Sequence, residues 1–358
     1  MINSPLKEII RSEAIIAEKS GKLTPKQLTI IYENKWFHLL VPEQYGGIEM
    51  DLPSFALFME ELAIVDGSFA WNVNLGAGAN MFAGYMSNNV AETIFRDPKA
   101  CIAGSGAASG TATKAGDHYI IQGYWKYASG SAHANFFSLN AKILNEEGED
   151  TGIFSSFIVP VHDVQNLNTW KTTGLRATAS NDFKVESKKV PLGYSFDLQK
   201  PSPTNNGVLY RFPFQILAEI NMLVMSTGLA KRFLELAKEI AEQKKKIKGG
   251  EVELVENWSY KNSWEKHEGE FIQDRDKVFS SLSNLWNKAN QRDSISTEEQ
   301  VSFTHEVLRC AESSRKLVDV LYPFMGMHTV FESSEINRVW RDFKVASQHY
   351  LISPVHFV

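Results

Sequence analysis

Residues 174–191 read GLRATASNDFKVESKKVP, and the pattern of this stretch indicates the class of fold. Its first nine residues are mostly small or polar, as in a loop. Residues 182–187 then alternate polar and apolar side chains, which predicts a half-buried β-strand. Pro191 and the Pro- and Asn-rich residues 200–207 follow, and they predict the end of a β-region and a linker.

Further strands are predicted on the N-terminal side of this stretch, at residues 119–121, 136–143 and 154–160. Each is a short run of β-branched and aromatic residues bounded by Gly, Asn or Asp. Trp125 is interpreted as a core aromatic residue of the same region. A β-region therefore occupies the middle of the chain.

Helical signals lie on both sides of the β-region. Thr24, Pro25 and Gln27 form the pattern of an N-cap with a capping box, and residues 53–65 carry apolar side chains at helical spacing. Residues 250–295 are polar with scattered tryptophans and give no clear element. Three helices are predicted after the linker: from Phe214 to Gly249-Gly250, from Thr297 with Gln300 as its cap partner to Pro323, and from Ser333 to Leu351.

The order of these elements predicts an α+β fold in three parts. An N-terminal helical domain is expected over residues 1–99, a middle β-domain over residues 100–199 and a C-terminal helical domain over residues 208–358.

Composition excludes several classes of function. The chain has 358 residues and a formal net charge of −5, so no broad basic field favours nucleic acid. Its two cysteines exclude a disulfide framework, and no histidine pair stands at metal-ligand spacing, so no metal site is predicted. No apolar stretch reaches the ~18 residues of a membrane span, and the N-terminus lacks the apolar core of a signal peptide. We therefore expect a soluble, cytoplasmic protein.

Several nucleotide-binding and catalytic motifs are absent. Residues 104–110 (GSGAASG) look like a dinucleotide loop, but the third glycine stands one place late and no βαβ unit follows. No Gly-Lys-Ser/Thr closes a P-loop, and no Gly-x-Ser-x-Gly elbow occurs. Nicotinamide-binding folds and serine hydrolases of the elbow type are therefore disfavoured.

Three motifs together give the chain a family resemblance. Residues 40–47 (LVPEQYGG) look like a PEEYGG turn, residues 174–182 with Val190-Pro191 are similar to a GxRxTxSxD…VP segment, and residues 338–342 (RVWRD) match RxxRD. In this order they resemble the acyl-CoA dehydrogenase superfamily of flavoproteins over nearly the whole chain. The resemblance implies a β-barrel-like middle domain, a C-terminal four-helix bundle and a homotetramer. Arg341 and Asp342 are interpreted as a structural ion pair or cap.

Two further segments indicate the branch of the superfamily. Residues 103–112 and 123–134 resemble two-component flavin-dependent monooxygenases, whereas dehydrogenases have a TEPxAGSD loop that this chain lacks. The dehydrogenase glutamate would fall on Tyr350 or, in an alternative position, on Ala218. Glu219 is one residue, or about 100° of helix, away from that second position and should face elsewhere unless the alignment slips by one place.

The resemblance thus implies a monooxygenase or hydroxylase that uses reduced flavin and O2 on a small organic substrate, with a separate reductase supplying the flavin. FAD is the expected cofactor and FMN the alternative, because the RxxFG segment that dehydrogenases use to grip FAD is missing. Two other interpretations stay open: an acyl-CoA dehydrogenase with a displaced base, and a non-catalytic flavin-binding or structural member of the family.

The same resemblance implies the site residues. Ser129 would lie beside flavin N5 and act in catalysis, Tyr127 would lie against the isoalloxazine ring, and Ser131 belongs to the same cofactor-binding segment. His349 would be the acid/base on the substrate side, because an imidazole with a pKa near ~6.5 moves protons at neutral pH. His133 would line the substrate pocket. From the residues alone, the favoured interpretation of Ser129 is a turn residue beside glycine, and that of His349 is an interior or interface histidine.

Overall fold

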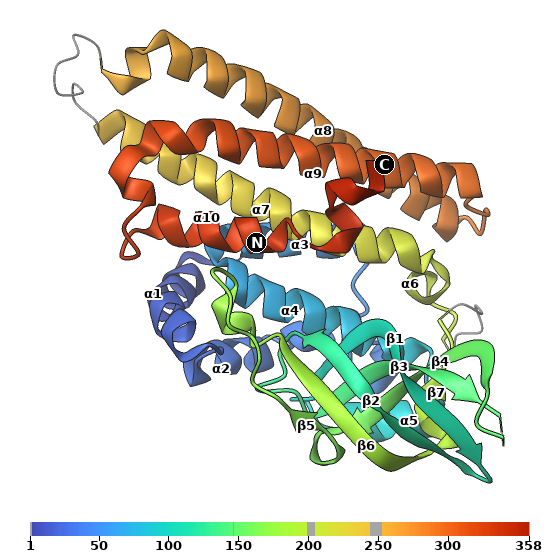
Figure 1. Cartoon of the computed structure of the whole chain (residues 1–358). Helices are drawn as coiled ribbons and strands as arrows, with labels where there is room; N and C mark the ends of the chain where they lie inside the picture. The colour runs from blue at the N-terminus through green and yellow to red at the C-terminus, as the bar shows by residue number, and fades with distance from the viewer. Residues whose placement is uncertain (1, 146, 199–204, 244–252, 358) are drawn as a thin grey trace.

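The computed structural model describes residues 2–145, 147–198, 205–243 and 253–357. Its elements follow the predicted order of helices, sheet and helices (Figure 1). Most of the predicted linker and the predicted helix end at Gly249-Gly250 lie outside the described residues. The domain boundaries given above stay a prediction.

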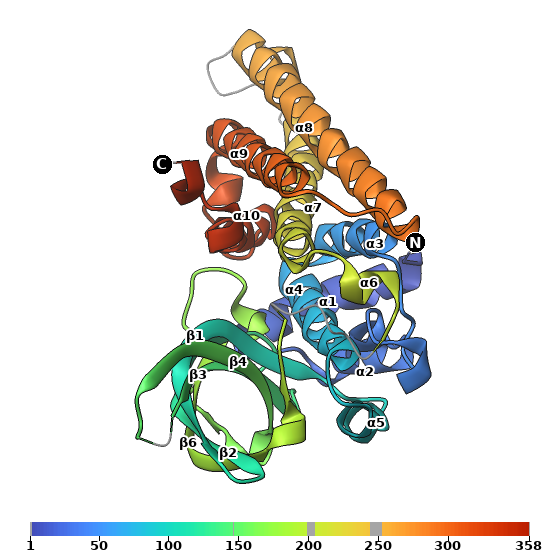
Figure 2. The ribbon, with the colours of Figure 1, turned by 90° about the vertical axis from the view of Figure 1, so that its right-hand side faces the viewer.

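The N-terminal helices join the other two parts of the molecule. The capping box predicted for α2 is confirmed, since the Thr24 hydroxyl accepts from the Gln27 N–H and the Gln27 side chain accepts from the Thr24 N–H. Of these helices, α4 is buried over most of its surface and packs against both β1 and α7 (Figures 1 and 2). The bounds are α1 (Ser4–Ser20), α2 (Pro25–Glu33), α3 (Leu52–Val65), α4 (Gly67–Asn80) and α5 (Asn88–Phe95).

The described strands form one mixed sheet in the order β5-β6-β2-β1-β3-β4-β7, in which β1 and β3 run parallel and the other neighbours antiparallel. All the predicted strands are present. The bounds are β1 (Ile102–Ala115), β2 (His118–Ala128), β3 (Phe136–Leu144), β4 (Asp150–Pro160), β5 (Gln165–Asn166), β6 (Asn181–Pro191) and β7 (Ser195–Phe196).

The sheet curls around its own core but does not close. Trp125 is fully buried in this core and stacks on Phe183 with ring centroids 5.4 Å apart, which confirms it as a core residue. The outer strands β5 and β7 have two residues each and do not pair with one another in the described part of the chain. The expected barrel-like domain is therefore observed as an open, strongly curved sheet.

The glycine-rich residues 104–110 lie inside β1, whose register against β3 shifts between Ser105 and Gly110. The chain then turns back into the antiparallel strand β2 and not into a helix. The segment is therefore not the strand-to-helix turn of a dinucleotide-binding fold, because it lies within a strand and is followed by a second strand.

The C-terminal helices pack around α7, which contacts α3, α9 and α10, while α8 lies along α9 (Figures 1 and 2). The bounds are α6 (Val208–Arg211), α7 (Phe214–Gln243), α8 (Trp258–Asn290), α9 (Thr297–Met325) and α10 (Glu335–Ala346). Among the described helices, none combines the length and the apolar composition that a membrane span requires.

The predicted start of α9 at Thr297 is confirmed, but its predicted cap and the predicted end of the last helix were wrong. The N-cap of α9 is Ser296, which forms a capping box with Glu299, and not Thr297 with Gln300. The earlier pair is preferred because a carboxylate is favourable at a helix N-terminus. The last helix, α10, ends at Ala346 and not at Leu351, because the following residues turn to bury Leu351 and Ile352. His349 therefore lies beyond the helix, in the turn that follows it.

The RxxRD segment of α10 ties the loop of the GxRxTxSxD segment to the helices. Asp342 Oδ1 accepts from the Leu175 N–H at 2.5 Å, and Arg341 donates to the Thr173 carbonyl and to Glu18. Gly174 makes this approach possible, because a Cβ there would lie 2.1 Å from the Arg341 carbonyl oxygen. Arg341 and Asp342 thus make structural contacts, but not as the ion pair or cap that was expected, because Arg341 pairs with Glu18 and Asp342 accepts from a backbone N–H.

Candidate functional site

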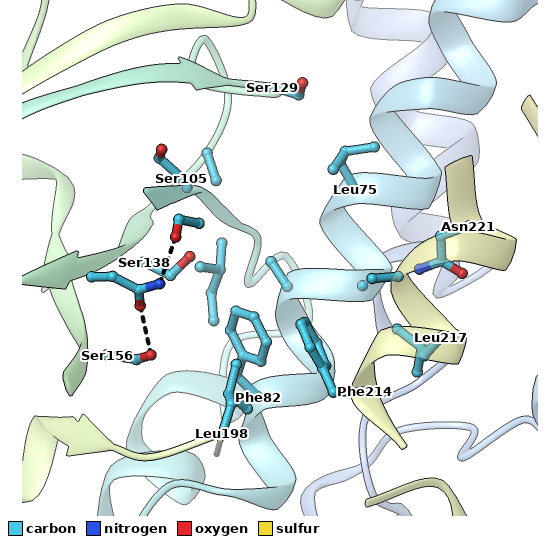
Figure 3. A pocket seen from close by; sticks show the side chains of 18 of the residues that line it. Leu75, Phe82, Ser105, Ser129, Ser138, Ser156, Leu198, Phe214, Leu217 and Asn221 are labelled. Carbon is cyan, nitrogen blue, oxygen red and sulfur yellow. Dashed lines mark hydrogen bonds between the residues drawn. The ribbon is translucent and has the colours of Figure 1, made fainter. Parts of the chain in front are cut away.

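A cavity of about 310 Å³ lies where α4, the sheet and the start of α7 meet. Serines and Asn140 line its sheet side, whereas the helices contribute mainly apolar side chains (Figure 3). Among the described residues that line it, none carries a charge. Its lining includes Asn74, Leu75, Phe82, Ser105, Ser129, Ser138, Phe214, Leu217, Ala218, Asn221, His349 and Tyr350.

Ser129 begins a chain of three hydroxyls that runs from the cavity into the protein. Its Oγ lies 2.7 Å from the Ser180 Oγ, which lies 2.7 Å from the Thr178 Oγ1. Thr178 donates to the Leu175 carbonyl at 2.8 Å. These three hydrogen bonds need three hydrogens, and the three hydroxyl groups supply one each, because the carbonyl has none. Thr178 therefore donates to the carbonyl, Ser180 donates to Thr178, and Ser129 donates to Ser180. All three hydrogens point away from the cavity.

Trp71 limits the Ser129 oxygen further. The Trp71 Nε1–H donates to the Ser129 Oγ at 2.9 Å and so occupies one of its two lone pairs. Ser129 accordingly offers the cavity one lone pair and no hydrogen. It can accept a hydrogen bond from a ligand, but with this network intact it cannot donate one.

His349 reaches the same cavity from the turn after α10. Its Nδ1 accepts from the Leu351 N–H at 3.4 Å, which leaves Nε2 to carry the proton of the neutral ring. Burial lowers the pKa of His349 to about 4. The sequence-based premise of a pKa near ~6.5 was therefore wrong, because half-burial against the helices removes the water that stabilises the charged ring.

The other predicted site residues do not line this cavity. Tyr127 is 64% exposed, has a φ of 68° and contacts the Trp170 ring edge-on. Ser131 is buried, donates to the Ala179 carbonyl and accepts from Asn181. Their assigned roles with flavin stay predictions.

His133 lies apart from His349, stacked on Phe37 with the ring planes 9° apart. Burial lowers the pKa of His133 to about 4, and its buried Nε2 has no hydrogen-bond partner among the described residues. Its role in a substrate pocket also stays a prediction. No group of metal-ligating side chains occurs in the described ranges.

The two positions at which a dehydrogenase would have its glutamate both lie on the cavity. They are Ala218 and Tyr350, and neither supplies a carboxylate. Glu219 does not line the cavity: its carboxylate accepts from Gln215 and Thr304. The expectation that Glu219 faces elsewhere is therefore confirmed.

Several residues of the site were missed from the sequence. Trp71, Asn74 and Ser180 are buried, and the first two lie on α4. A signal was available for α4, because asparagines at positions 72, 74 and 80 interrupt an otherwise apolar stretch. Buried polar side chains of this kind need partners and often mark a site. Ser180 carried no comparable signal.

Two family models match the chain: the acyl-CoA dehydrogenase N-terminal domain over residues 6–95 and the C-terminal domain over residues 222–354. An indole-3-acetate monooxygenase from Acinetobacter baumannii is 24% identical over 317 residues, which cover 87% of this chain and 80% of that protein. The oxygenase subunit HsaA of a flavin-dependent monooxygenase from Mycobacterium tuberculosis is 22% identical, over 96% of this chain and 89% of that one.

Solved structures share the fold at low sequence identity. XiaF from Streptomyces sp., in complex with FADH2 and glycerol, gives a TM-score of 0.91 at 21% identity, over 98% of this chain and 90% of that chain. TdsC from Paenibacillus sp. A11-2, in complex with FMN and indole, gives a TM-score of 0.74 at 20% identity, over 99% of this chain and 92% of that chain. The predicted superfamily and its monooxygenase branch are thereby confirmed. With both terminal domains matched and the fold shared throughout, this chain belongs to the acyl-CoA dehydrogenase superfamily.

Proposed function

We propose that this chain is the oxygenase component of a two-component flavin-dependent monooxygenase. It takes reduced flavin from a separate reductase and uses O2 to oxygenate a small organic substrate in the cavity. One observation carries the proposal: Ser129 and His349, from distant segments, meet on a cavity whose described lining contains no carboxylate. An α,β-dehydrogenation needs a base at the substrate carbon, and Ala218 and Tyr350 leave that position without a carboxylate.

Flavin fits the residues that are present. Reduced flavin, when bound, supplies the electrons that activate O2. Its reduced ring carries N–H groups, and the single free lone pair of Ser129 is suited to accept from one of them. Tyr127 offers an exposed aromatic face on the same segment. FAD is our first choice and FMN the second, because solved relatives hold one or the other.

His349 serves the substrate side of the cavity. The neutral imidazole donates from Nε2 while its Nδ1 accepts from Leu351. It can therefore position a substrate oxygen from Nε2 without holding a positive charge; to act as a base it takes the substrate proton at Nδ1, releases the Leu351 N–H and carries the positive charge for that step. The apolar side chains of Leu75, Phe82 and Phe214 keep water away from the reacting atoms.

The resemblance to the superfamily supports three finer points of the proposal. They are a homotetramer, a cytoplasmic location, and a sheet and C-terminal helices that act as the barrel-like domain and the four-helix bundle of this fold.

Isotope labelling tests the proposal. Purified protein, a flavin reductase, NADH and ¹⁸O2 are incubated with a panel of phenols and indoles, and products are analysed by mass spectrometry. The proposal expects one ¹⁸O atom in a product that requires the protein. Bleaching of protein-bound flavin by acyl-CoA under anaerobic conditions would instead show a dehydrogenase, and failure to bind FAD or FMN in either redox state would show a non-catalytic member.

A further inference from the structure

Asp342, on α10, holds the loop that carries Thr178 and Ser180. Its Oδ1 accepts from the Leu175 N–H at 2.5 Å, and both residues are buried. The carbonyl of the same Leu175 receives the last hydrogen of the hydroxyl chain that begins at Ser129. Asp342 is therefore one backbone residue away from the network that decides what Ser129 offers to the cavity.

The backbone of Leu175 has a conformation that needs support. Its φ is 49°, in the left-handed region, which is unfavourable for a residue with a side chain. Ala179, which follows the same short turn, has a φ of 45°. Without the Asp342 oxygen, the Leu175 N–H would lose its acceptor in a buried place, which is a second unfavourable term. The contact with Asp342 thus stabilises a strained loop in one conformation.

The direction of the hydroxyl chain depends on where the Leu175 carbonyl lies. While this carbonyl accepts from Thr178 at 2.8 Å, every hydrogen of the chain points away from the cavity. The Trp170 Nε1–H donates to the same oxygen at 2.8 Å, so the carbonyl keeps a donor even when Thr178 no longer reaches it. Thr178 can then donate to Ser180, and Ser180 to Ser129, which reverses the chain.

Reversal of the chain changes what Ser129 presents. Its oxygen would accept from both Trp71 and Ser180, so that both of its lone pairs are occupied. Its hydrogen would point to the cavity. Ser129 would change from an acceptor to a donor without any substitution at the site itself.

Asp342 also adjoins α4, the helix that carries Trp71. A Cβ at Gly67, the first residue of α4, would lie 3.3 Å from the Asp342 Oδ2. Trp71 lies about one turn further along α4 and donates to Ser129 at 2.9 Å. One carboxyl group therefore contacts both elements that hold Ser129, the loop and α4.

We propose that Asp342 is a positioning residue of the flavin site, because its contact with Leu175 keeps the hydroxyl chain directed away from the cavity and Ser129 an acceptor. The proposal rests on the proposed function, since it needs flavin beside Ser129. It gives the RxxRD aspartate a part in which redox state of flavin the site prefers. With the contact intact the site favours reduced flavin, and without it the site favours oxidised flavin.

Four proteins test this role: wild type, Asp342→Ala, Asp342→Asn and Arg341→Met. Asp342→Ala removes the acceptor of the Leu175 N–H, whereas Asp342→Asn keeps an acceptor oxygen. Arg341→Met is the matched control. It removes the contacts of Arg341 with Thr173 and Glu18 in the same junction and leaves Asp342 unchanged. The dissociation constants of reduced and oxidised flavin are measured anaerobically for each protein, with whichever of FMN and FAD binds more tightly.

In Asp342→Ala, the affinity for oxidised flavin should rise and that for reduced flavin should fall, each by roughly two- to tenfold, the range of one net hydrogen bond. Asp342→Asn and Arg341→Met should keep the wild-type ratio of the two constants, whatever their Tm. A loss of stability alone does not reverse this ratio. The proposal is overturned if Asp342→Ala keeps the wild-type ratio, or if Asp342→Asn or Arg341→Met shows the same change as Asp342→Ala.

If Asp342→Ala does not fold, Thr178→Val decides. Valine keeps the shape of threonine but removes the hydroxyl to which Ser180 donates, so the chain should reverse and the ratio should change in the same direction. An unchanged ratio in Thr178→Val is then the contrary result.

Ser129→Ala separates this proposal from the proposed function. Its ratio should differ from that of the wild type, because the acceptor itself is gone. A protein that binds no flavin, or a wild-type ratio in Ser129→Ala, contradicts the flavin site, and the role of Asp342 falls with it. A ratio that changes in Ser129→Ala but not in Asp342→Ala contradicts only the role of Asp342.

Discussion

Ser129 shows how three hydroxyl hydrogens decide what a side chain can do. Its own hydrogen goes to Ser180, because Thr178 is committed to the Leu175 carbonyl and Ser180 to Thr178. Oxidised flavin presents a bare N5, which needs a donor, whereas reduced flavin presents N5–H, which needs an acceptor. The network therefore favours reduced flavin if Ser129 lies beside N5.

Replacing Ser180 with alanine should weaken this preference. Ser129 then has no hydroxyl to which it donates, and its hydrogen can turn to the cavity. Affinity for oxidised flavin should rise by roughly two- to tenfold, the range of one net hydrogen bond, while affinity for reduced flavin should not rise. Fluorescence titration in air and absorbance titration under anaerobic conditions measure the two constants.

Thr172→Val is the control for Ser180→Ala, because Thr172 donates to the Gly174 carbonyl in the same loop but takes no part in the chain to Ser129. Its ratio of the two dissociation constants should equal that of the wild type. An unchanged ratio in Ser180→Ala would mean that Ser129 does not contact N5.

Replacing His349 with asparagine should uncouple oxygen use from product formation. Asparagine keeps a polar group but no acid/base function, whose loss typically costs ~10²–10⁴-fold in the step it serves. Product should fall and hydrogen peroxide should rise, while flavin still binds. The ratio of product to peroxide with saturating reduced flavin measures this.

The pH profile separates the two views of His349. With a pKa of about 4, the ring stays neutral throughout the working range. The ratio of product to peroxide is measured against pH for the wild type and His349→Asn. The wild type should show no inflection near pH ~6.5 that is absent from the variant. An inflection near pH ~6.5 that is lost in His349→Asn would instead show that the pKa of His349 is close to its unperturbed value.

At the scale of elements, pattern alone located the helices and strands whose signal is local. The capping box of α2 and the alternation in β6 are local, and both were predicted. The helix α8 was missed because it buries only a narrow stripe, Tyr260, Phe271, Val278, Leu282, Leu285 and Ala289, in an otherwise polar sequence. The buried face of α8 is determined by its contact with α9 and not by the composition of α8 itself.

The junction between α10 and the loop before β6 should be sensitive to pH. Burial and the negative charge of Asp66 raise the pKa of Asp342 to about 7. The folded state thus holds this proton more tightly than the unfolded chain, in which an aspartate has a pKa near ~3.9. The contribution of Asp342 to the free energy of unfolding of the wild type therefore decreases as the pH rises from about 4 to 7.

Asp342→Asn should remove this loss. The carboxamide oxygen can still accept from the Leu175 N–H, and no charge is buried. The Tm of the variant minus the Tm of the wild type should be several degrees larger at pH 8 than at pH 5. Thermal unfolding at both pH values measures the difference, and a difference that shrinks as pH rises would show that the ionised carboxylate is the stabilising form.

At the scale of the whole molecule, the cavity joins segments that no local pattern connects. The motifs predicted the fold and named Ser129 and His349, but their meeting on one cavity depends on how α4, the sheet and α7 pack. The hydrogen-bond state of Ser129 depends on Trp71 and Ser180, and the pKa of His349 on burial. These properties arise only from tertiary contacts.

The chain alone should not oxidise NADH or NADPH at an enzymatic rate. Its glycine-rich segment is a bulged strand, and no helix N-terminus follows it to receive a pyrophosphate. Absorbance of NADH with protein and flavin should stay constant until a reductase is added. Steady consumption without a reductase would contradict the two-component arrangement.

The measurement that bears most directly on the proposed site is an anaerobic titration of the wild-type protein with reduced and oxidised FMN and FAD. We expect at least one reduced flavin to bind with a stoichiometry of one per chain, and roughly two- to tenfold more tightly than its oxidised form. Binding of neither flavin, or tighter binding of the oxidised form, would contradict a site in which Ser129 presents only an acceptor to the cavity.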